Sequence, residues 1–286
     1  MSLSEYNICS CVIYIAVIVG GTFGNGLVCY IVYTNRNLRT APNFQLVALA
    51  VADLIVCTIA SPLRFVVSVR RLITSSAIIN DGECFWETLT TFSSIIITVI
   101  MLAGISLTRF IGITNKVTKE TMKKFINLSI VISFCIGICY GTIKANLGKG
   151  GPCGIIDVPE KVIIGAKIGI GITFVSLLVS MVSNICICCI TQSNHRALKR
   201  ALGDGGRHGK ATNIATMKLS LRLVVCFMII YLPITIHGIL VINELVERNP
   251  SFANFLFAIC CAGSAVNPII YTLTSSAYKN HLPWKK

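Results

Sequence analysis

Charged residues are scarce in this sequence, since Asp, Glu, Lys and Arg together make up 13% of the 286 residues. Soluble domains carry about 25% charged residues. Half of that share excludes an ordinary cytosolic enzyme, and a content of 54% hydrophobic residues excludes a disordered chain. At a mean hydropathy of +0.78, the number of long apolar segments should determine the architecture.

Acidic residues are the scarcer kind of charge, with 11 Asp and Glu against 25 Lys and Arg and a net charge of +14. A basic chain indicates nucleic-acid binding only when the charge lies on a soluble surface. The sequence also lacks internal repeats, several charges along an intramembrane path, and any nucleophile–base or metal-ligand constellation within its apolar segments. These absences argue against an enzyme and make a transporter the less favoured alternative.

Long apolar segments, in contrast, are abundant. A helix needs roughly 20 apolar residues to cross a bilayer core about 30 Å thick, and lipid leaves no partner for an unpaired backbone group. We therefore predict an all-α membrane protein: a seven-transmembrane helix bundle over residues 8–273, between a short extracellular segment, 1–7, and a short cytoplasmic helix or tail, 274–286. The predicted spans are Ile8–Tyr33, Phe44–Val69, Cys84–Phe110, Phe125–Ile143, Val162–Ile190, Met217–Ile242 and Phe252–Leu273.

Basic residues are concentrated on one side of this arrangement. The loops at 34–43, 111–124 and 191–216, with the tail and the adjoining helix ends, hold most of the Lys and Arg residues but only two acids, Glu120 and Asp204. Because positively charged loops stay in the cytoplasm, we expect a multi-pass plasma-membrane protein with an extracellular N-terminus and a cytoplasmic C-terminus. The excess charge then faces anionic lipid and cytosolic partners, and nucleic acid is no longer an expected partner.

One ionisable residue, Asp53, lies in the middle of a predicted span, where such groups are costly and point to function. A buried carboxyl that orients its neighbours is one interpretation. The other is a weak Na⁺ site, because hard cations prefer oxygen ligands. Polar groups at a similar depth are expected from Asn25, Thr98, Ser264 and Asn267, and no other cofactor is expected.

The sixth and seventh predicted spans each contain a proline. Pro268 follows Asn267 in the seventh span, and Pro233 follows Phe227 and Tyr231 in the sixth. Proline removes a backbone donor and kinks a helix. Two kinked helices with aromatic residues at the bend suit a bundle that opens at its cytoplasmic end.

Arg109 ends the third span at the predicted cytoplasmic face, where it either snorkels to the head groups or has a functional role. Cys84 begins the same span on the outside, and Cys153 lies in an extracellular loop. Since both cysteines face an oxidising compartment, we expect a disulfide bond between them.

Taken together and in order, these residues resemble the rhodopsin-like (class A) G-protein-coupled receptor family. The resemblance runs from the first span to the segment after the seventh. It implies an extracellular agonist, opening of the sixth helix, and nucleotide exchange on a heterotrimeric G protein, with Arg109 meeting that protein or holding the resting state. The residues that carry it are Gly24, Asn25, Asp53, Pro62, Cys84, Arg109, Cys153, Phe227, Pro233, Asn267, Pro268, Tyr271 and Tyr278.

The sequence departs from the family pattern at the cytoplasmic end of the third span. The family's Asp-Arg-Tyr reads Thr108-Arg109-Phe110, and no acidic residue occupies Met217–Arg222. Both of the acids that usually hold the arginine are therefore absent from the sequence, and we predict a weakened inactive state.

Other departures concern the activation mechanism. The fourth span has no Trp, the fifth has no Pro, Lys161–Ile190 contains no Tyr to partner Tyr271, and Tyr231 replaces the family's toggle tryptophan. The alternative to a signalling receptor is therefore a receptor-like seven-helix protein that binds or traffics without activating G proteins.

The sequence narrows the class of ligand that the protein is expected to bind. The seventh span has no Lys, which excludes a retinal Schiff base there, and Thr91 stands where amine receptors of the family carry an aspartate. The short N-terminal segment argues against a large protein ligand. Arg64, Lys144 and Lys167 are expected to line an outer cavity with Tyr231 and to favour an anionic small molecule or lipid, unless they snorkel to head groups.

Overall fold

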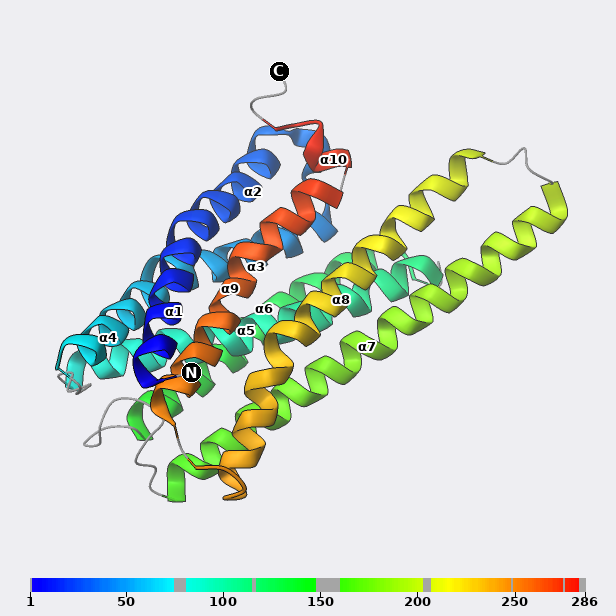
Figure 1. Ribbon diagram of the computed structural model, residues 1–286. Coiled ribbons are helices and arrows are strands. Elements are labelled where there is room, and N and C mark those ends of the chain that lie inside the picture. The colour runs from blue at the N-terminus through cyan, green and yellow to red at the C-terminus, as the bar shows by residue number, and fades with distance from the viewer. Residues whose placement is uncertain are drawn as a thin grey trace.

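The computed structural model describes residues 2–74, 81–114, 117–147, 160–202, 207–247, 249–274 and 276–282. Within these ranges every regular element is a helix (Figure 1). The elements are α1 (Leu3–Ala16), the π-helix η1 (Val17–Gly21), α2 (Thr22–Thr34), the short 3-10 helix η2 (Arg36–Leu38), α3 (Ala41–Ile55), the π-helix η3 (Val56–Ala60), α4 (Ser61–Thr74), α5 (Asp81–Thr114), α6 (Lys119–Leu147), α7 (Glu160–Leu202), α8 (Arg207–Ile242), α9 (Pro250–Thr274) and α10 (Ser276–Lys279).

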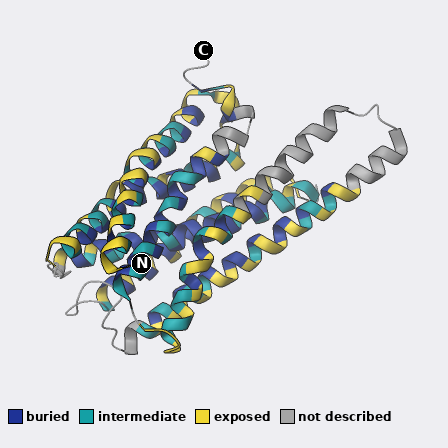
Figure 2. Ribbon diagram, viewed as in Figure 1, coloured by how far each residue is buried: buried dark blue, intermediate teal, exposed yellow. Residues whose placement is uncertain are grey.

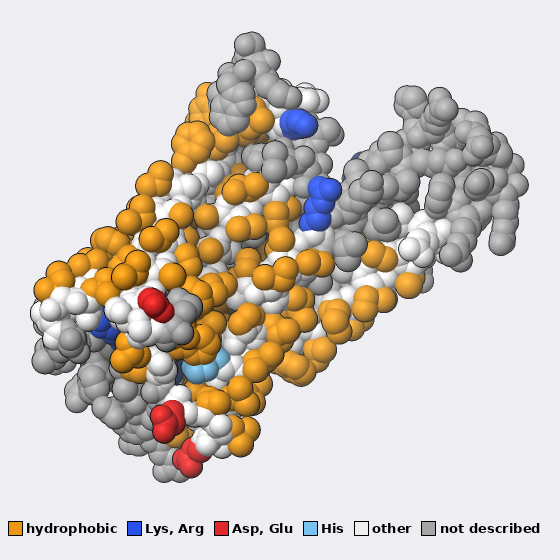
Figure 3. All heavy atoms as spheres, viewed as in Figure 1, with side chains coloured by type: hydrophobic (Ala, Val, Ile, Leu, Met, Phe, Trp, Pro, Cys, Tyr) orange, Lys and Arg blue, Asp and Glu red, His pale blue; other side chains and the backbone are white. Residues whose placement is uncertain are grey.

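Seven helical spans are long and apolar enough to cross a membrane, which confirms the predicted all-α, seven-helix membrane bundle. Large apolar side chains remain exposed along the flanks of the bundle, as lipid contact requires (Figures 2 and 3). The first span combines α1, η1 and α2, and the second combines α3, η3 and α4. The spans are Leu3–Thr34, Ala41–Thr74, Gly82–Thr114, Lys119–Leu147, Ile163–Ser193, Val225–Ile242 and Pro250–Ile270.

The first helix begins at Leu3, before the predicted Ile8, because a capping box precedes it. The Ser2 hydroxyl accepts a hydrogen bond from the Glu5 amide at 3.3 Å, and the Glu5 carboxylate accepts one from the Ser2 amide at 2.7 Å. This reciprocal pair satisfies backbone donors that a helix start leaves open. Most of the segment 1–7 is therefore helical.

Polar residues and prolines also mark the start of two other spans. The Asn249 side chain accepts a hydrogen bond from the Phe252 amide at 2.9 Å, and Pro250 is the first residue of α9. Pro42 lies in the first turn of α3. Proline suits this position because its missing N–H would have no partner inside the helix. The seventh helix therefore begins shortly before the predicted Phe252.

The helices pack around two central elements. α5 packs along α6 and α7, and α9 packs against α1, α2 and α8 (Figure 1). Gly24 permits the close approach of α2 to α9, since a Cβ added there would lie 2.7 Å from Cγ of Pro268. We call the end of the bundle where α1, α5 and α9 begin the N-terminal side, and the end where α10 lies the C-terminal side.

Two features extend the bundle on the C-terminal side. α7 continues past the predicted Ile190, and α8 begins before the predicted Met217, so both helices reach beyond the apolar spans (Figure 1). The short helix α10 follows α9, as the sequence predicts, and Tyr278 on it is buried against the apolar core. Burial raises the pKa of the Tyr278 hydroxyl to about 12, although the nearby positive charge of Arg109 opposes the rise.

Candidate functional site

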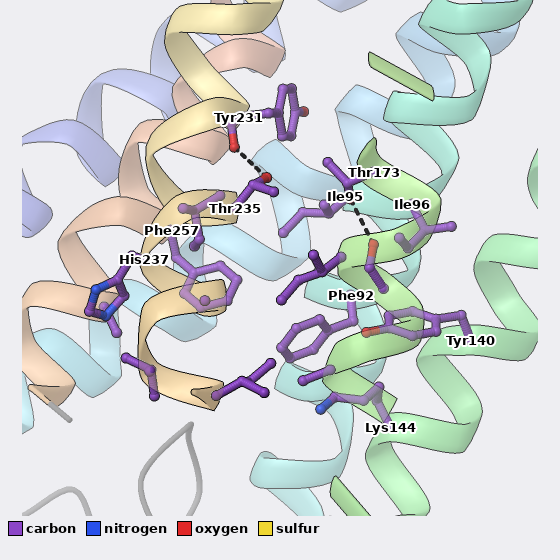
Figure 4. A pocket seen from close by; sticks show the side chains of 18 of the residues that line it. Phe92, Ile95, Ile96, Tyr140, Lys144, Thr173, Tyr231, Thr235, His237 and Phe257 are labelled. Carbon is purple, nitrogen blue, oxygen red and sulfur yellow. Dashed lines mark hydrogen bonds between the residues drawn. The ribbon is translucent and has the colours of Figure 1, made fainter. Parts of the chain in front are cut away.

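A cavity of about 190 Å³ lies in the N-terminal half of the bundle and is lined by residues of α5, α6, α7, α8 and α9. Its wall is mostly apolar, with polar side chains at a few points (Figure 4). Figure 4 places Lys144 of α6 and His237 of α8 on different sides of the cavity. The lining includes Phe92, Ile95, Ile96, Tyr140, Lys144, Ile170, Thr173, Tyr231, Ile234, Thr235, His237 and Phe257.

The structure separates the residues that the sequence predicts for this cavity. Lys144 and Tyr231 line it. Lys167 lies on the exposed surface of α7, and Thr91 lines a second, much smaller cavity. Arg64 is buried beside Thr91 and lines neither cavity.

Arg64 belongs to a polar cluster that joins four helices. Its guanidinium lies 2.5 Å from the Glu87 carboxylate, and both side chains are 7% exposed. The Arg64 carbonyl accepts a hydrogen bond from the Ser68 hydroxyl, which in turn accepts one from the Asn254 amide. The Tyr14 hydroxyl donates to Asn254. Helices α1, α4, α5 and α9 are thereby held together on the N-terminal side.

Arg64 also packs against the wall of the large cavity, although it does not line the cavity itself. The Arg64 guanidinium lies over the Phe257 ring, 4.2 Å from its centre, and Phe257 packs edge-to-face against Phe92. The Lys144 ammonium lies 5.2 Å from the centre of the Phe92 ring. Because cations are attracted to the faces of aromatic rings, the two basic side chains and the two rings form one continuous wall.

Tyr231 connects the large cavity to the interior. It lines both the large cavity and the small one, and its ring packs at 4.9 Å from that of Phe227. The Tyr231 carbonyl accepts a hydrogen bond from the Thr235 hydroxyl at 2.7 Å. Pro233 lies between these two residues and has no backbone N–H to donate within α8. A ligand in the large cavity would therefore contact Tyr231, which also borders the polar interior of the bundle.

The polar interior is centred on Asp53, which is fully buried. Its carboxylate accepts hydrogen bonds from Ser264 at 2.8 Å and from the Asn267 amide at 2.9 Å. The Asn25 amide instead donates to the Ser264 backbone carbonyl at 2.8 Å. Thr98 Oγ1 is buried beside the same carboxylate.

These groups fit a weakly bound sodium ion. Asp53 supplies a negative oxygen, and Ser264 and Thr98 supply hydroxyl oxygens beside it. Thr98 and Ser264 also line the small cavity of about 10 Å³, which lies at the lower limit of the space that one water molecule occupies. The oxygen-only donor set is that of a hard cation.

On the C-terminal side, Thr108 is part of an uncharged cluster. Its hydroxyl donates to Gln45 Oε1 at 3.0 Å, and the Gln45 amide lies 3.0 Å from Ser129 Oγ, to which it donates. Gln45 and Thr108 are buried. This cluster joins α3, α5 and α6 at the position where the family pattern has an acid. Arg109, the next residue, is half-buried.

Two of the predicted site residues lie wholly or partly outside the described structure. The backbone of Tyr271 is helical, but its side chain is not described. Cys84 is disulfide-bonded, whereas Cys153 lies outside the described residues, so their pairing stays a prediction.

The sequence matches the family described as 7 transmembrane receptor (rhodopsin family) over residues 24–271. This match covers most of the chain, from within the first span to the end of the seventh. The chain belongs to the rhodopsin family of seven-transmembrane receptors. It is accordingly a multi-pass membrane protein of receptor type, and the expected family resemblance is confirmed.

Individual receptors are more distantly similar. Rat somatostatin receptor type 1 (Rattus norvegicus) is 23% identical over 291 aligned positions, covering 93% of this chain and 68% of that receptor. Neuromedin-U receptor 1 of Mus musculus is 44% identical over 54 residues, covering 19% of this chain and 13% of that receptor. Its Homo sapiens counterpart is 26% identical over 112 residues, covering 39% of this chain and 26% of that receptor. The chain therefore matches only short parts of the neuromedin-U receptors.

Two groups of residues in this receptor were missed by sequence reasoning. Glu87 is a second acid within a predicted span, and it lies one helical turn before Thr91, which could have singled it out as a partner for Arg64. Gln45 and Ser129 gave no signal, because isolated polar residues near the ends of spans are common and only the packing of three helices brings them to Thr108.

Proposed function

We propose that this chain is a G-protein-coupled receptor of the plasma membrane, with its N-terminus outside the cell and its C-terminus in the cytoplasm. A ligand enters the large cavity from outside, and opening of α8 exposes the C-terminal side to a heterotrimeric G protein. Family membership supports the receptor type, and the concentration of Lys and Arg in the loops on the C-terminal side supports the orientation.

The position of Tyr231 is the observation that carries this proposal. Tyr231 lies on the helix that contains Pro233, contacts the large cavity on one side, and lines the small cavity of Thr98 and Ser264 on the other. A ligand that displaces Tyr231 therefore changes the packing of α8 and the surroundings of Asp53 in one step. In this scheme, sodium bound at Asp53 favours the resting packing.

The relatives do not agree on a ligand, since their names refer to neuromedin U, somatostatin, dopamine and RYamide. The cavity volume of about 190 Å³ is below the 300–1,000 Å³ that is usual for drug-sized ligands. This supports a small ligand, or a small anchoring part of a larger one.

Basal G-protein activation tests the proposal without a known agonist. The full chain with an N-terminal epitope is expressed in cells, and G-protein dissociation is measured across the G-protein classes beside Arg109→Ala. We expect antibody binding to intact cells and basal activation in at least one class, which Arg109→Ala reduces at equal surface expression.

A surface-expressed protein that activates no class would contradict G-protein coupling and favour the alternative, a receptor-like protein that binds or traffics without signalling. Antibody binding only after permeabilisation would contradict the orientation. The two parts of the proposal are therefore tested separately in one experiment.

A further inference from the structure

Three cysteines lie close together near the C-terminal end of the fifth span. Cys186, Cys188 and Cys189 belong to α7, and all three are free thiols. They are followed, after one isoleucine, by the polar sequence that begins at Thr191, and the span itself ends at Ser193. The proposed signalling scheme uses none of these thiols.

The packing of Ile187 determines which way these thiols point. Ile187 is fully buried, so its side of α7 faces the bundle. Because successive residues of an α-helix are about 100° apart, Cys186 and Cys188 lie on the flanks of the helix and Cys189 lies on the side opposite Ile187. The exposures agree, since Cys186 and Cys188 are partly exposed and Cys189 is exposed. Cys189 therefore faces the surroundings of the bundle.

Cys189 continues a row of exposed apolar side chains along α7 (Figure 2). Val182 and Ile185 precede it in this row, and both are exposed as lipid contact requires. One turn beyond Cys189, the exposed residues are the polar Gln192 and Ser193. At a rise of 1.5 Å per residue, Cys189 lies about 5 Å along the helix from these polar residues. Its thiol is therefore at the boundary between the lipid hydrocarbon and the aqueous phase.

Packing does not account for an exposed thiol at this boundary. Cysteines that fill gaps in the interior of a helix bundle are buried, as Cys57, Cys260 and Cys261 are in this chain. Cys189 is exposed and fills no such gap. Cysteines next to the membrane are instead acceptors for reversible S-palmitoylation, since the thiol meets the aqueous phase and the attached chain enters the lipid.

We propose that Cys189, with Cys186 and Cys188 as flanking acceptors, is acylated by a long-chain fatty acid. The donor is a long-chain acyl-CoA, and a cellular acyltransferase catalyses the exchange. The thiol sulfur attacks the thioester carbonyl carbon, a new sulfur–carbon bond forms, and the bond from that carbon to the sulfur of coenzyme A breaks. The thiol proton passes to the departing coenzyme A, so no oxidant or reductant is needed. The acyl chain then lies along the exposed row that contains Val182 and Ile185.

Acylation at this place rests on the proposed orientation of the chain, because acyl-CoA is present in the cytosol and the C-terminal side must face it. The concentration of Lys and Arg in the loops on that side supports this orientation. Acylation does not depend on G-protein coupling. An acyl chain at Cys189 anchors α7 to the membrane at the point where the helix continues past its apolar span to Leu202.

Metabolic labelling of the full chain in cells tests the site. Cells that express the chain with an N-terminal epitope are given an alkyne analogue of palmitate. The label on the captured protein is measured before and after treatment with neutral hydroxylamine, which cleaves thioesters. We expect the parent to carry label that hydroxylamine removes. Cys189→Ala should lose most of this label, and the triple variant Cys186→Ala, Cys188→Ala, Cys189→Ala should lose all of it.

Cys135 and Cys139 of α6 provide the matched control, because they are also free and exposed but lie at a different depth. Since α6 begins at Lys119 on the C-terminal side, these two thiols lie about 24 and 30 Å along the helix from that end. They are too deep in the bilayer to meet cytosolic acyl-CoA. The double variant Cys135→Ala, Cys139→Ala should therefore keep the label of the parent. Equal antibody binding to intact cells shows that each variant reaches the surface like the parent.

A parent without hydroxylamine-sensitive label, a triple variant that keeps its label, or an α6 double variant that loses it would overturn the inference. Antibody binding only after permeabilisation would contradict the orientation and the acylation together. An epitope that is accessible on intact cells, combined with an unlabelled protein, would contradict the acylation alone. Conversely, a labelled protein that activates no G protein would keep the acylation site and contradict only the proposed signalling.

Discussion

The Arg64 guanidinium and the Glu87 carboxylate lie 2.5 Å apart between α4 and α5, with 7% of each side chain exposed. The same two helices carry a second ion pair, Arg70 with Glu83, at 2.9 Å and with 39% exposure. The two pairs have the same chemistry and differ in burial, so each serves as a control for the other.

We expect Glu87→Gln to destabilise the protein strongly, because it leaves the Arg64 guanidinium buried without its carboxylate. Breaking one side of a buried pair costs about 3–5 kcal/mol, whereas an exposed pair contributes about 0–1 kcal/mol. Glu83→Gln should therefore lower the unfolding midpoint far less. Replacing both Arg64 and Glu87 by Met should be milder than Glu87→Gln alone. Similar midpoints for Glu87→Gln and Glu83→Gln, measured on purified protein in detergent, would contradict this.

The contact between α5 and α6 depends on the absence of a side chain at Gly141. A Cβ built there would overlap the Ser93 hydroxyl and lie 2.7 Å from the Leu89 carbonyl oxygen. Gly141→Ala should therefore push the helices apart and cost about 1–3 kcal/mol. Gly171→Ala is the control, because nothing lies within 4 Å of a Cβ at Gly171 and alanine favours a helix. Thermal unfolding should show a loss of stability for Gly141→Ala and no loss of stability for Gly171→Ala. The reverse order would refute the packing argument.

The seven spans could be predicted from hydropathy because lipid imposes one requirement on every crossing, a long apolar helix. The helix ends were less predictable. The start at Leu3 depends on the Ser2–Glu5 capping box, which lies outside the apolar segment. The extensions of α7 and α8 consist mostly of polar residues, which hydropathy does not distinguish from a loop.

The candidate site could be predicted only where its residues lie at the same depth in the membrane. Asp53, Ser264 and Asn267 meet as the central positions of their spans suggest. The rotation of each helix cannot be read from hydropathy, and it decides that Arg64 faces Glu87 while Lys144 faces the cavity. From hydropathy alone Arg64, Lys144 and Lys167 are equivalent cations, and only packing makes them different.

Thr108 provides a test of the predicted weak inactive state. Its hydroxyl is hydrogen-bonded to Gln45, so the cluster next to Arg109 is uncharged. Thr108→Asp should lower basal G-protein activation, because a carboxylate beside Arg109 favours the resting position of the guanidinium. A bias of about 1 kcal/mol would reduce the active fraction about fivefold.

Thr108→Asn is the control for this change, since its amide has nearly the same shape as the carboxylate but no charge. Both variants are compared with the parent at equal surface expression. Equal basal activation in the Asp and Asn variants would show that the charge does not hold the resting state.

Sodium should stabilise the parent through Asp53. The carboxylate, the Ser264 hydroxyl and the Thr98 oxygen form an oxygen-only donor set in the interior of the bundle. At a sodium concentration ten times the Kd, a ligand that binds only the folded state adds about 1.4 kcal/mol. We therefore expect NaCl to raise the unfolding midpoint of the parent above its value in choline chloride of equal ionic strength.

Asp53→Asn should remove this difference between the two salts, because the amide keeps a polar group in place but lacks the charge that attracts the cation. Thr98→Val should weaken it, since the valine removes one oxygen at nearly constant volume. Screening by salt acts on both chlorides alike and cancels in the comparison. A sodium response of the same size in the parent and in Asp53→Asn would mean that the carboxylate does not bind the ion. Its role would then be to orient Ser264 and Asn267 through its two hydrogen bonds, which need no ion.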